Sequence, residues 1–259
     1  MIPPLLHFIW IKGRPFSQRE SLCLKSALKN TPYQIILHTN LEPGDAGEYC
    51  PYSLQHPRFT LNYNQFSLDI RGIKVRPATL SDILRIQILQ EHGGIYSDMD
   101  MLWLQPFPIP LDTVSLVAPW ENQSYKIVTN CMIASEKGYN FTPLLQEYDN
   151  ILDSLKKKGI TKVDGDTLKD HLTLFKATSL FLRTHADVLL KRCHFGKNTW
   201  KTIWKFLTDQ VPEEKIVLDG ITGIHLCGCG LFGQYRINTL DLLTKHSKLK
   251  KITEEILAT

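Results

Sequence analysis

Short apolar runs alternate with segments of helical spacing along the first half of the chain. The runs Leu5–Ile11 and Tyr33–Thr39 predict strands, and the apolar positions of Ser17–Asn30 between them predict a helix. Because strand and helix patterns take turns, the sequence predicts an α/β fold: a mostly parallel, Rossmann-like sheet flanked by helices on both faces.

The rest of the chain has weaker patterns and a more helical character. Strands are predicted at Val114–Ala118 and Asn130–Ala134, and loops at 40–66 and 105–110. The later elements expected are helices at Phe141–Leu155, Leu180–Lys191, Thr199–Thr208 and Leu240–Ala258 and a short strand at Ile216–Leu218. No repeat or linker divides the sequence, so residues 1–259 are expected to form one domain.

The segment Ala78–Asp100 has the clearest local signals. Thr79, with Asp82 three residues later, is the expected start of a helix, and Gly93-Gly94 is its expected end. The next six residues, Ile-Tyr-Ser-Asp-Met-Asp, alternate with period two and predict a strand that ends in two carboxylates.

On that strand, Asp98 and Asp100 would point to the same side. Two neighbouring carboxylates are typical of a site for a hard divalent cation, although an acidic strand end in solvent has the same sequence. Asp82 and Arg85 lie on one helix face, where they could form an ion pair or point together at a ligand.

The composition is that of a globular protein, with 43% hydrophobic and 22% charged residues. A net charge of +4 is too small to indicate nucleic acid as a partner. No apolar run reaches the roughly 20 residues of a membrane span, and no basic region precedes the apolar start as in a signal peptide. These features favour a cytoplasmic protein of bacterial or viral source, whose six cysteines lack a zinc-site spacing.

Two segments, SDILR…GGIYSDMD at 81–100 and IPPLLHFIWI at 2–11, resemble known sugar transferases. They are similar to the group that contains yeast-type mannosyltransferases, bacterial capsule and lipopolysaccharide sugar transferases, and the glucosylating domains of large clostridial toxins. The resemblance implies the A-type glycosyltransferase fold. It also implies metal-dependent transfer of a hexose or pentose, with retention, from a nucleotide-sugar, favoured as a UDP-sugar, to a glycan hydroxyl.

The resemblance also implies roles for residues around the donor. Trp10 would stack on uracil, and Tyr96 would pack against the nucleotide. Asp82 would contact the transferred sugar, Arg85 would bind its hydroxyls or a phosphate, and Asn130 would lie near it.

A metal, Mn²⁺ or Mg²⁺, is the implied cofactor. Asp98, Asp100 and His225 would hold it together with the donor diphosphate, and Asp98 would also contact the ribose. His225 opens a His-x-x-Gly element in which the backbone of Gly228 would approach the diphosphate; otherwise His225 is a residue of a glycine-rich turn.

Two other functions fit parts of the pattern. A non-catalytic carbohydrate-binding pseudo-transferase would share the fold, and a metal-dependent phosphohydrolase or nucleotidyltransferase would share the acidic pair. The intact acidic and arginine residues argue against the first, and the full motif context argues against the second. A basic stripe is either a solvated helix face or a contact for an anionic glycan or a lipid headgroup; it comprises Lys191, Arg192, Lys197, Lys201 and Lys205.

Overall fold

The structure is a computed structural model that describes residues 1–13, 16–45, 49, 51–122, 127–163, 168–190, 222–226 and 247–258. Its main sheet has the strand order β12-β8-β10-β6-β1-β2-β3, with β9 paired to β8. The strands are β1 (Leu5–Trp10), β2 (Gln34–Thr39), β3 (Phe59–Tyr63), β6 (Gly94–Ser97), β8 (Leu116–Asn122), β9 (Ile127–Val128), β10 (Met132–Ser135) and β12 (Val188–Leu190).

Two smaller sheets and two short helical turns accompany it. The first small sheet has the order β11-β5-β4, and the second pairs β13 with β7. These elements are β4 (Asp69–Ile70), β5 (Ile73–Val75), β7 (Met101–Trp103), β11 (Lys162–Val163), β13 (Gly223–His225), and the 3₁₀ turns η1 (Pro43–Asp45) and η2 (Pro51–Ser53).

The main sheet is mostly parallel, as the alternating pattern predicts. Strands β6, β1, β2 and β3 run in one direction, and β12 is parallel to β8. Strand β10 is antiparallel to both of its neighbours, β6 and β8. Strands β6 and β8 on its two sides therefore run in the same direction, and β10 runs against both of them.

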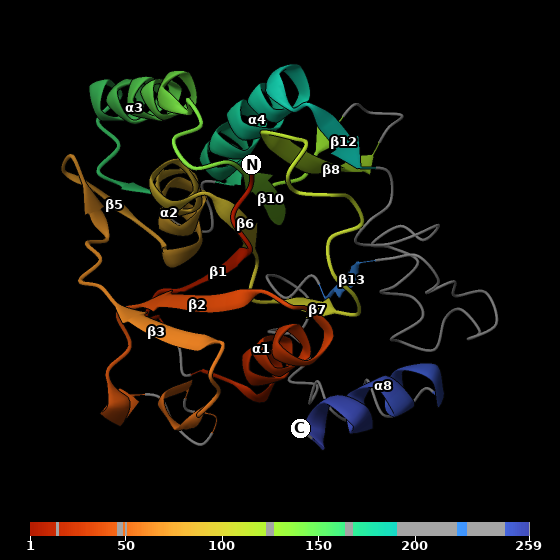
Figure 1. Cartoon of the computed structure of the whole chain (residues 1–259). Helices are drawn as coiled ribbons and strands as arrows, with labels where there is room; N and C mark the ends of the chain where they lie inside the picture. Colours follow the sequence, from red (N-terminus) through yellow and green to blue (C-terminus); the bar gives the residue numbers. More distant parts are fainter. Residues whose placement is uncertain are drawn as a thin grey trace.

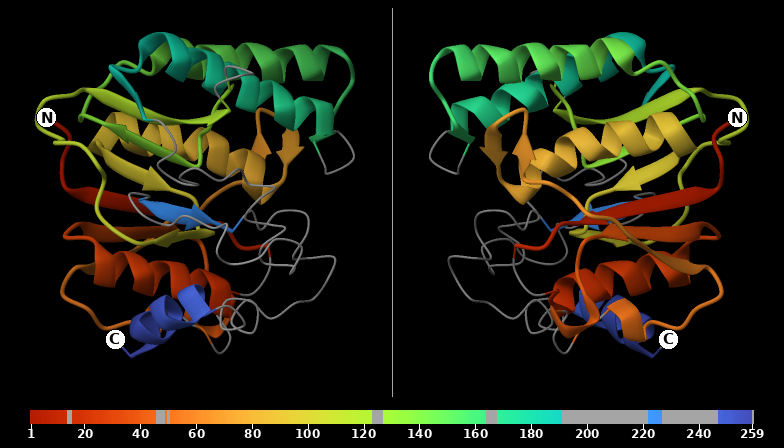
Figure 2. Two further views of the ribbon diagram at one scale, coloured as in Figure 1. Left: turned by 90° about the vertical axis from the view of Figure 1, so that its right-hand side faces the viewer. Right: turned by 90° about the vertical axis from the view of Figure 1, so that its left-hand side faces the viewer.

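Helices cover both faces of the main sheet (Figure 1). They are α1 (Gln18–Asn30), α2 (Pro77–His92), α3 (Thr142–Lys157), α4 (Leu168–His185) and α8 (Ser247–Leu257). Helices α2, α3 and α4 lie on one side, and α1 and α8 lie on the other (Figure 2). A hydrophobic core lies on each face of the sheet, and strand β1 contributes side chains to both. Phe8 packs in the core with α1, whereas Ile9 packs in the core with α2.

Helix α1 begins where the sequence predicts. Ser17 and Glu20 form a capping box, in which the Ser17 N–H donates to Glu20 Oε2 at 3.0 Å. The Arg19 guanidinium donates to the other Glu20 oxygen at 2.6 Å. Because Glu20 is fully buried, this pairing supplies the charge compensation that its carboxylate needs.

Helix α2 begins earlier than Thr79, the start expected from sequence. Its N-cap is Arg76, and Pro77 occupies the first turn, so Thr79 is a buried residue inside the helix. Proline suits that place because its φ is already helical and its missing N–H would have no partner there.

The Gly93-Gly94 stop is confirmed, and the chain needs both glycines. Their φ angles are +68° and +95°. A Cβ on Gly93 would lie 2.5 Å from the Lys137 nitrogen, and one on Gly94 would lie 2.8 Å from the Leu5 oxygen. The turn can therefore carry the chain from α2 directly into the centre of the sheet.

Two further sequence predictions are wrong. Residues Phe59–Tyr63, expected in a loop, form an edge strand that pairs in parallel with β2. This strand is short and partly exposed, so its sequence contains no continuous apolar run that would have predicted it. The helix expected at Leu180–Lys191 begins at Leu168 and ends at His185, and Val188–Leu190 instead joins β8.

The helix ends before Val188 because the side chain of Asp187 holds the following residues next to β8. The Asp187 carboxylate accepts the N–H groups of Ser115 and Leu116, at 2.6 and 2.9 Å, and so fixes the chain beside β8. The helix expected at Leu240–Ala258 is described from Ser247 to Leu257, as α8, and its residues 240–246 lie outside the described part of the chain. The helix expected at Thr199–Thr208, the strand at Ile216–Leu218 and the basic stripe also lie outside it. Among the helices that are described, no segment combines the length and hydrophobicity required to cross a bilayer.

A chain of hydrogen bonds links buried histidines across the parallel strands. The Gly93 carbonyl lies 3.0 Å from His7 Nε2, and His7 Nδ1 lies 3.0 Å from His38 Nε2. Asn62 Nδ2 completes the chain at 3.2 Å from His38 Nδ1. Each contact is satisfied when both imidazoles are neutral and donate through Nε2. Burial lowers the pKa of His7 to about 4 and that of His38 to about 3.

Candidate active site

The two acidic residues lie at the carboxyl edge of the parallel strands, next to the end of β1. The expected strand over 95–100 is too long, because β6 ends at Ser97. Asp98 follows it, and Asp100 lies in a turn in which the Met101 N–H donates to the Asp98 carbonyl at 3.2 Å. The turn, rather than strand periodicity, brings the two carboxylates together.

His225 reaches the same place from the far end of the chain. It lies on β13, which pairs with β7 so that His225 is opposite Met101. The Leu226 N–H donates to the Asp100 carbonyl at 2.9 Å. A Cβ on Gly223 would lie 2.7 Å from the Leu102 oxygen, so only glycine allows β13 to approach this closely.

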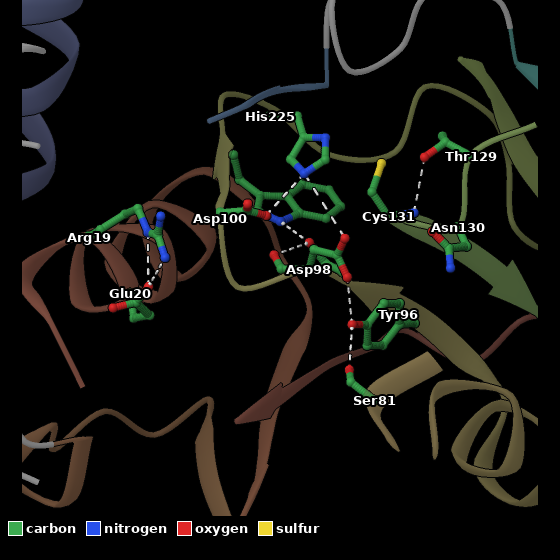
Figure 3. Close-up of polar contacts among 12 residues, drawn as sticks. Arg19, Glu20, Ser81, Tyr96, Asp98, Asp100, Thr129, Asn130, Cys131 and His225 are labelled. Carbon is green, nitrogen blue, oxygen red and sulfur yellow. Dashed lines mark hydrogen bonds and ion pairs between the residues drawn. The ribbon is translucent and has the colours of Figure 1, made fainter. Parts of the chain in front are cut away.

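The three side chains form a compact group (Figure 3). His225 Nε2 lies 3.0 Å from Asp100 Oδ1 and 4.0 Å from Asp98 Oδ2. One ligand atom from each residue lies within 4.8 Å of the other two. Two carboxylates and an imidazole are a donor set that suits Mn²⁺, and their oxygens also suit Mg²⁺. The group therefore fits a divalent cation.

The electrostatics of the group favour a bound cation. Burial raises the pKa of Asp98, and the neighbouring Asp100 carboxylate raises it further. The Arg85 guanidinium opposes the rise. A positive ion between the carboxylates would remove the repulsion that Arg85 compensates only in part.

Arg85 organises one side of the site. Its guanidinium donates to the Asn130 carbonyl at 2.6 Å and lies 2.8 Å from Asp82 Oδ1 and 3.2 Å from Asp98 Oδ1. It also lies over the Tyr96 ring, 4.4 Å from the centroid. Arg85 is only 4% exposed, so most of its donors are committed to the protein.

Asp82 and Asn130 are held together beside it. Asn130 Nδ2 donates to Asp82 Oδ1 at 2.9 Å, and both residues are buried. The expected ion pair on the α2 face is thus present, and Asn130 joins it from the chain segment before β10.

Part of the chain is similar to a known protein family. Residues 17–125 match the family model described as a glycosyltransferase sugar-binding region containing a DXD motif. Within those residues, Asp98-Met99-Asp100 is the single Asp-x-Asp. Residues 17–125 are therefore similar to the sugar-binding region of glycosyltransferases that contain a DXD motif.

Solved structures of glycosyltransferases resemble the chain in fold. The glycosyltransferase GlyE of Streptococcus pneumoniae is 12% identical with a TM-score of 0.54; the match covers 100% of this chain and 61% of that protein. The PaToxG glycosyltransferase is 21% identical with a TM-score of 0.49, over 71% of this chain and 69% of the other. A sequence comparison with curated proteins gave no significant match. The A-type glycosyltransferase fold expected from sequence is confirmed.

The two aromatic residues expected near the nucleotide, Trp10 and Tyr96, have different surroundings. Trp10 ends β1 at the same sheet edge as Asp98, is 8% exposed and makes an edge-to-face contact with Phe16 at 5.3 Å. Tyr96 is 1% exposed, and its hydroxyl donates to Asp98 Oδ1 at 2.6 Å. Tyr96 thus faces the acidic pair from within the core. Gly228 lies outside the described residues.

Three further residues lie around the site and are not among the predicted site residues. Ser81 Oγ lies 3.3 Å from the Tyr96 hydroxyl. The buried Cys131 thiol hydrogen-bonds the His225 imidazole, and the Cys131 carbonyl accepts the Asp98 N–H at 2.8 Å. Arg19 faces the site from α1 (Figure 3), and Asp100 contributes to raising its pKa. The place of Ser81 at the start of the SDILR motif, and of Cys131 directly after Asn130, could have suggested a role for these two residues.

Proposed function

We propose that the protein is a metal-dependent glycosyltransferase that moves a hexose or pentose from a UDP-sugar to a hydroxyl of a glycan acceptor, with retention of anomeric configuration. The observation that carries the proposal is the convergence of Asp98, Asp100 and His225 at the edge of the sheet, within a glycosyltransferase fold. We also propose that residues 1–259 act as a single catalytic domain.

In this proposal Asp98, Asp100 and His225 hold Mn²⁺ or Mg²⁺. The bound ion would supply Lewis-acid assistance by neutralising charge on the departing diphosphate. The protein's own part is to keep the three ligands close and partly shielded from water: their side chains are 24%, 15% and 17% exposed. His225 must be neutral to act as a ligand.

The sugar would be oriented by the buried group next to the acidic pair. We propose that Asp82 and Asn130 contact the transferred sugar, because their hydrogen bond fixes both side chains at the same edge. We propose that Arg85 lies beside the donor, and its contacts with Asp82, Asp98 and the Asn130 carbonyl support a role in holding that group in position. Fixed orientation of the reacting groups is a major source of rate acceleration.

A donor screen tests the proposed function. Purified protein is incubated with UDP- and GDP-sugars and Mn²⁺, release of nucleoside diphosphate is measured, and the anomeric configuration of any product is read by NMR. UDP release that EDTA abolishes and Mn²⁺ restores is the expected result. Binding of UDP-sugars with no turnover on any glycan acceptor or on water would instead favour a pseudo-transferase.

Trp10→Ala is expected to raise the KM for the UDP-sugar by about 10-fold with a smaller change in kcat. The reason is that stacking on a base is worth about 1–3 kcal/mol and is made equally in ground and transition states. The matched variant Trp10→Phe keeps a ring and should retain most of the affinity. A KM unchanged in both folded variants would remove Trp10 from the donor site.

A further inference from the structure

We propose that Tyr96 is a positioning residue for the metal site: its hydroxyl holds one oxygen of Asp98 so that the other faces His225. The inference rests on the proposed function and adds to it a residue that acts through Asp98. The sequence predicts that Tyr96 packs against the nucleotide, and the structure adds that its hydroxyl donates to the Asp98 carboxylate from the protein interior.

The two oxygens of Asp98 have different surroundings. Oδ1 accepts the Tyr96 hydroxyl at 2.6 Å and lies 3.2 Å from Arg85 Nη1. Oδ2 lies 4.0 Å from His225 Nε2, on the side of the candidate metal ligands. The carboxylate is therefore divided between one oxygen engaged by the protein and one directed at the site.

Tyr96 is itself fixed on several sides. It lies in the middle of the sheet, opposite His7 on β1 and Ile133 on β10. The Arg85 guanidinium covers its ring, and Ser81 Oγ lies 3.3 Å from its hydroxyl. A donor held this firmly can determine which carboxylate oxygen it engages.

The Tyr96 hydroxyl selects one oxygen of Asp98 in a way that the Arg85 guanidinium does not. A guanidinium attracts both carboxylate oxygens, whereas one O–H group donates to one of them. Without the hydroxyl, Asp98 could rotate and offer either oxygen to the site. Loss of such an outer contact to a metal ligand typically costs 10- to 100-fold in metal affinity.

The test is direct Mn²⁺ binding, measured by the EPR signal of free Mn²⁺ in the presence of UDP. Tyr96→Phe is expected to raise the Kd for Mn²⁺ by about 10-fold. Tyr148→Phe is the matched control, because Tyr148 is equally buried and its hydroxyl contacts Thr178 at 2.5 Å rather than Asp98. Its Kd is expected to equal that of the wild type.

A double-mutant cycle separates positioning from a general structural effect. If Tyr96 acts through Asp98, adding Tyr96→Phe to Asp98→Asn should cost little more than Asp98→Asn alone. A full additional 10-fold loss in that background would overturn the inference, as would equal Mn²⁺ affinity of Tyr96→Phe and the wild type. Failure of the wild type to bind Mn²⁺ would overturn both this inference and the proposed metal role.

Discussion

Asp100→Asn is expected to lower kcat/KM for sugar transfer by about 10²–10³-fold while the protein remains folded. Asp100 lies 3.0 Å from His225 and belongs to the compact group that fits a divalent cation. The amide removes a negative charge where positive charge has to be held, and electrostatic stabilisation of a leaving group is commonly worth that much. Steady-state kinetics at saturating Mn²⁺, with circular dichroism of the variant, measure the effect.

Asp112→Asn is the matched control for this substitution. Asp112 is exposed in the loop before β8, so the same change of charge should leave kcat/KM within about 2-fold. Turnover by Asp100→Asn at the wild-type rate, or full wild-type turnover in excess EDTA, would contradict the metal assignment.

Acidification from pH 8 to pH 5 is expected to reduce the free energy of unfolding by about 4 kcal/mol through His7 and His38 alone. Their folded pKa values, about 4 and about 3, lie below the ordinary value of 6.5. Between the folded pKa values and 6.5, the unfolded chain binds more protons than the folded protein. The free energy of unfolding therefore keeps its full value above about pH 6.5 and decreases as the pH falls below it. Urea unfolding at a series of pH values measures this loss.

His38→Gln tests the assignment of that loss. The variant should be less stable than the wild type at pH 8, because it interrupts the hydrogen-bond chain between His7 and Asn62. Its further loss between pH 8 and pH 5 should nevertheless be about half that of the wild type, since one of the two titrating groups is gone. His185→Gln, at an exposed position on α4, should keep the full loss. An undiminished loss in His38→Gln would exclude the histidine pair as its source.

The features that sequence predicted correctly depend on neighbours a few residues apart. The helix that starts at Ser17, the Gly93-Gly94 stop and the pairing of Asp82 with Arg85 all depend on contacts within four residues or on backbone angles that glycine alone adopts easily. Where the local signal was incomplete, the prediction failed, as at Thr79, which lies inside a helix that Pro77 begins.

The sequence alone determined the α/β fold and placed an acidic pair at the end of its central strand. Tertiary structure decided what surrounds that pair. It brought His225, the ligand implied by the resemblance, to the pair through the pairing of β13 with β7. It also turned the Tyr96 hydroxyl toward Asp98 and engaged the Arg85 donors with Asp82, Asp98 and the Asn130 carbonyl. Contacts between residues far apart in the chain depend on which strands pair and in which direction, and local periodicity does not encode that choice.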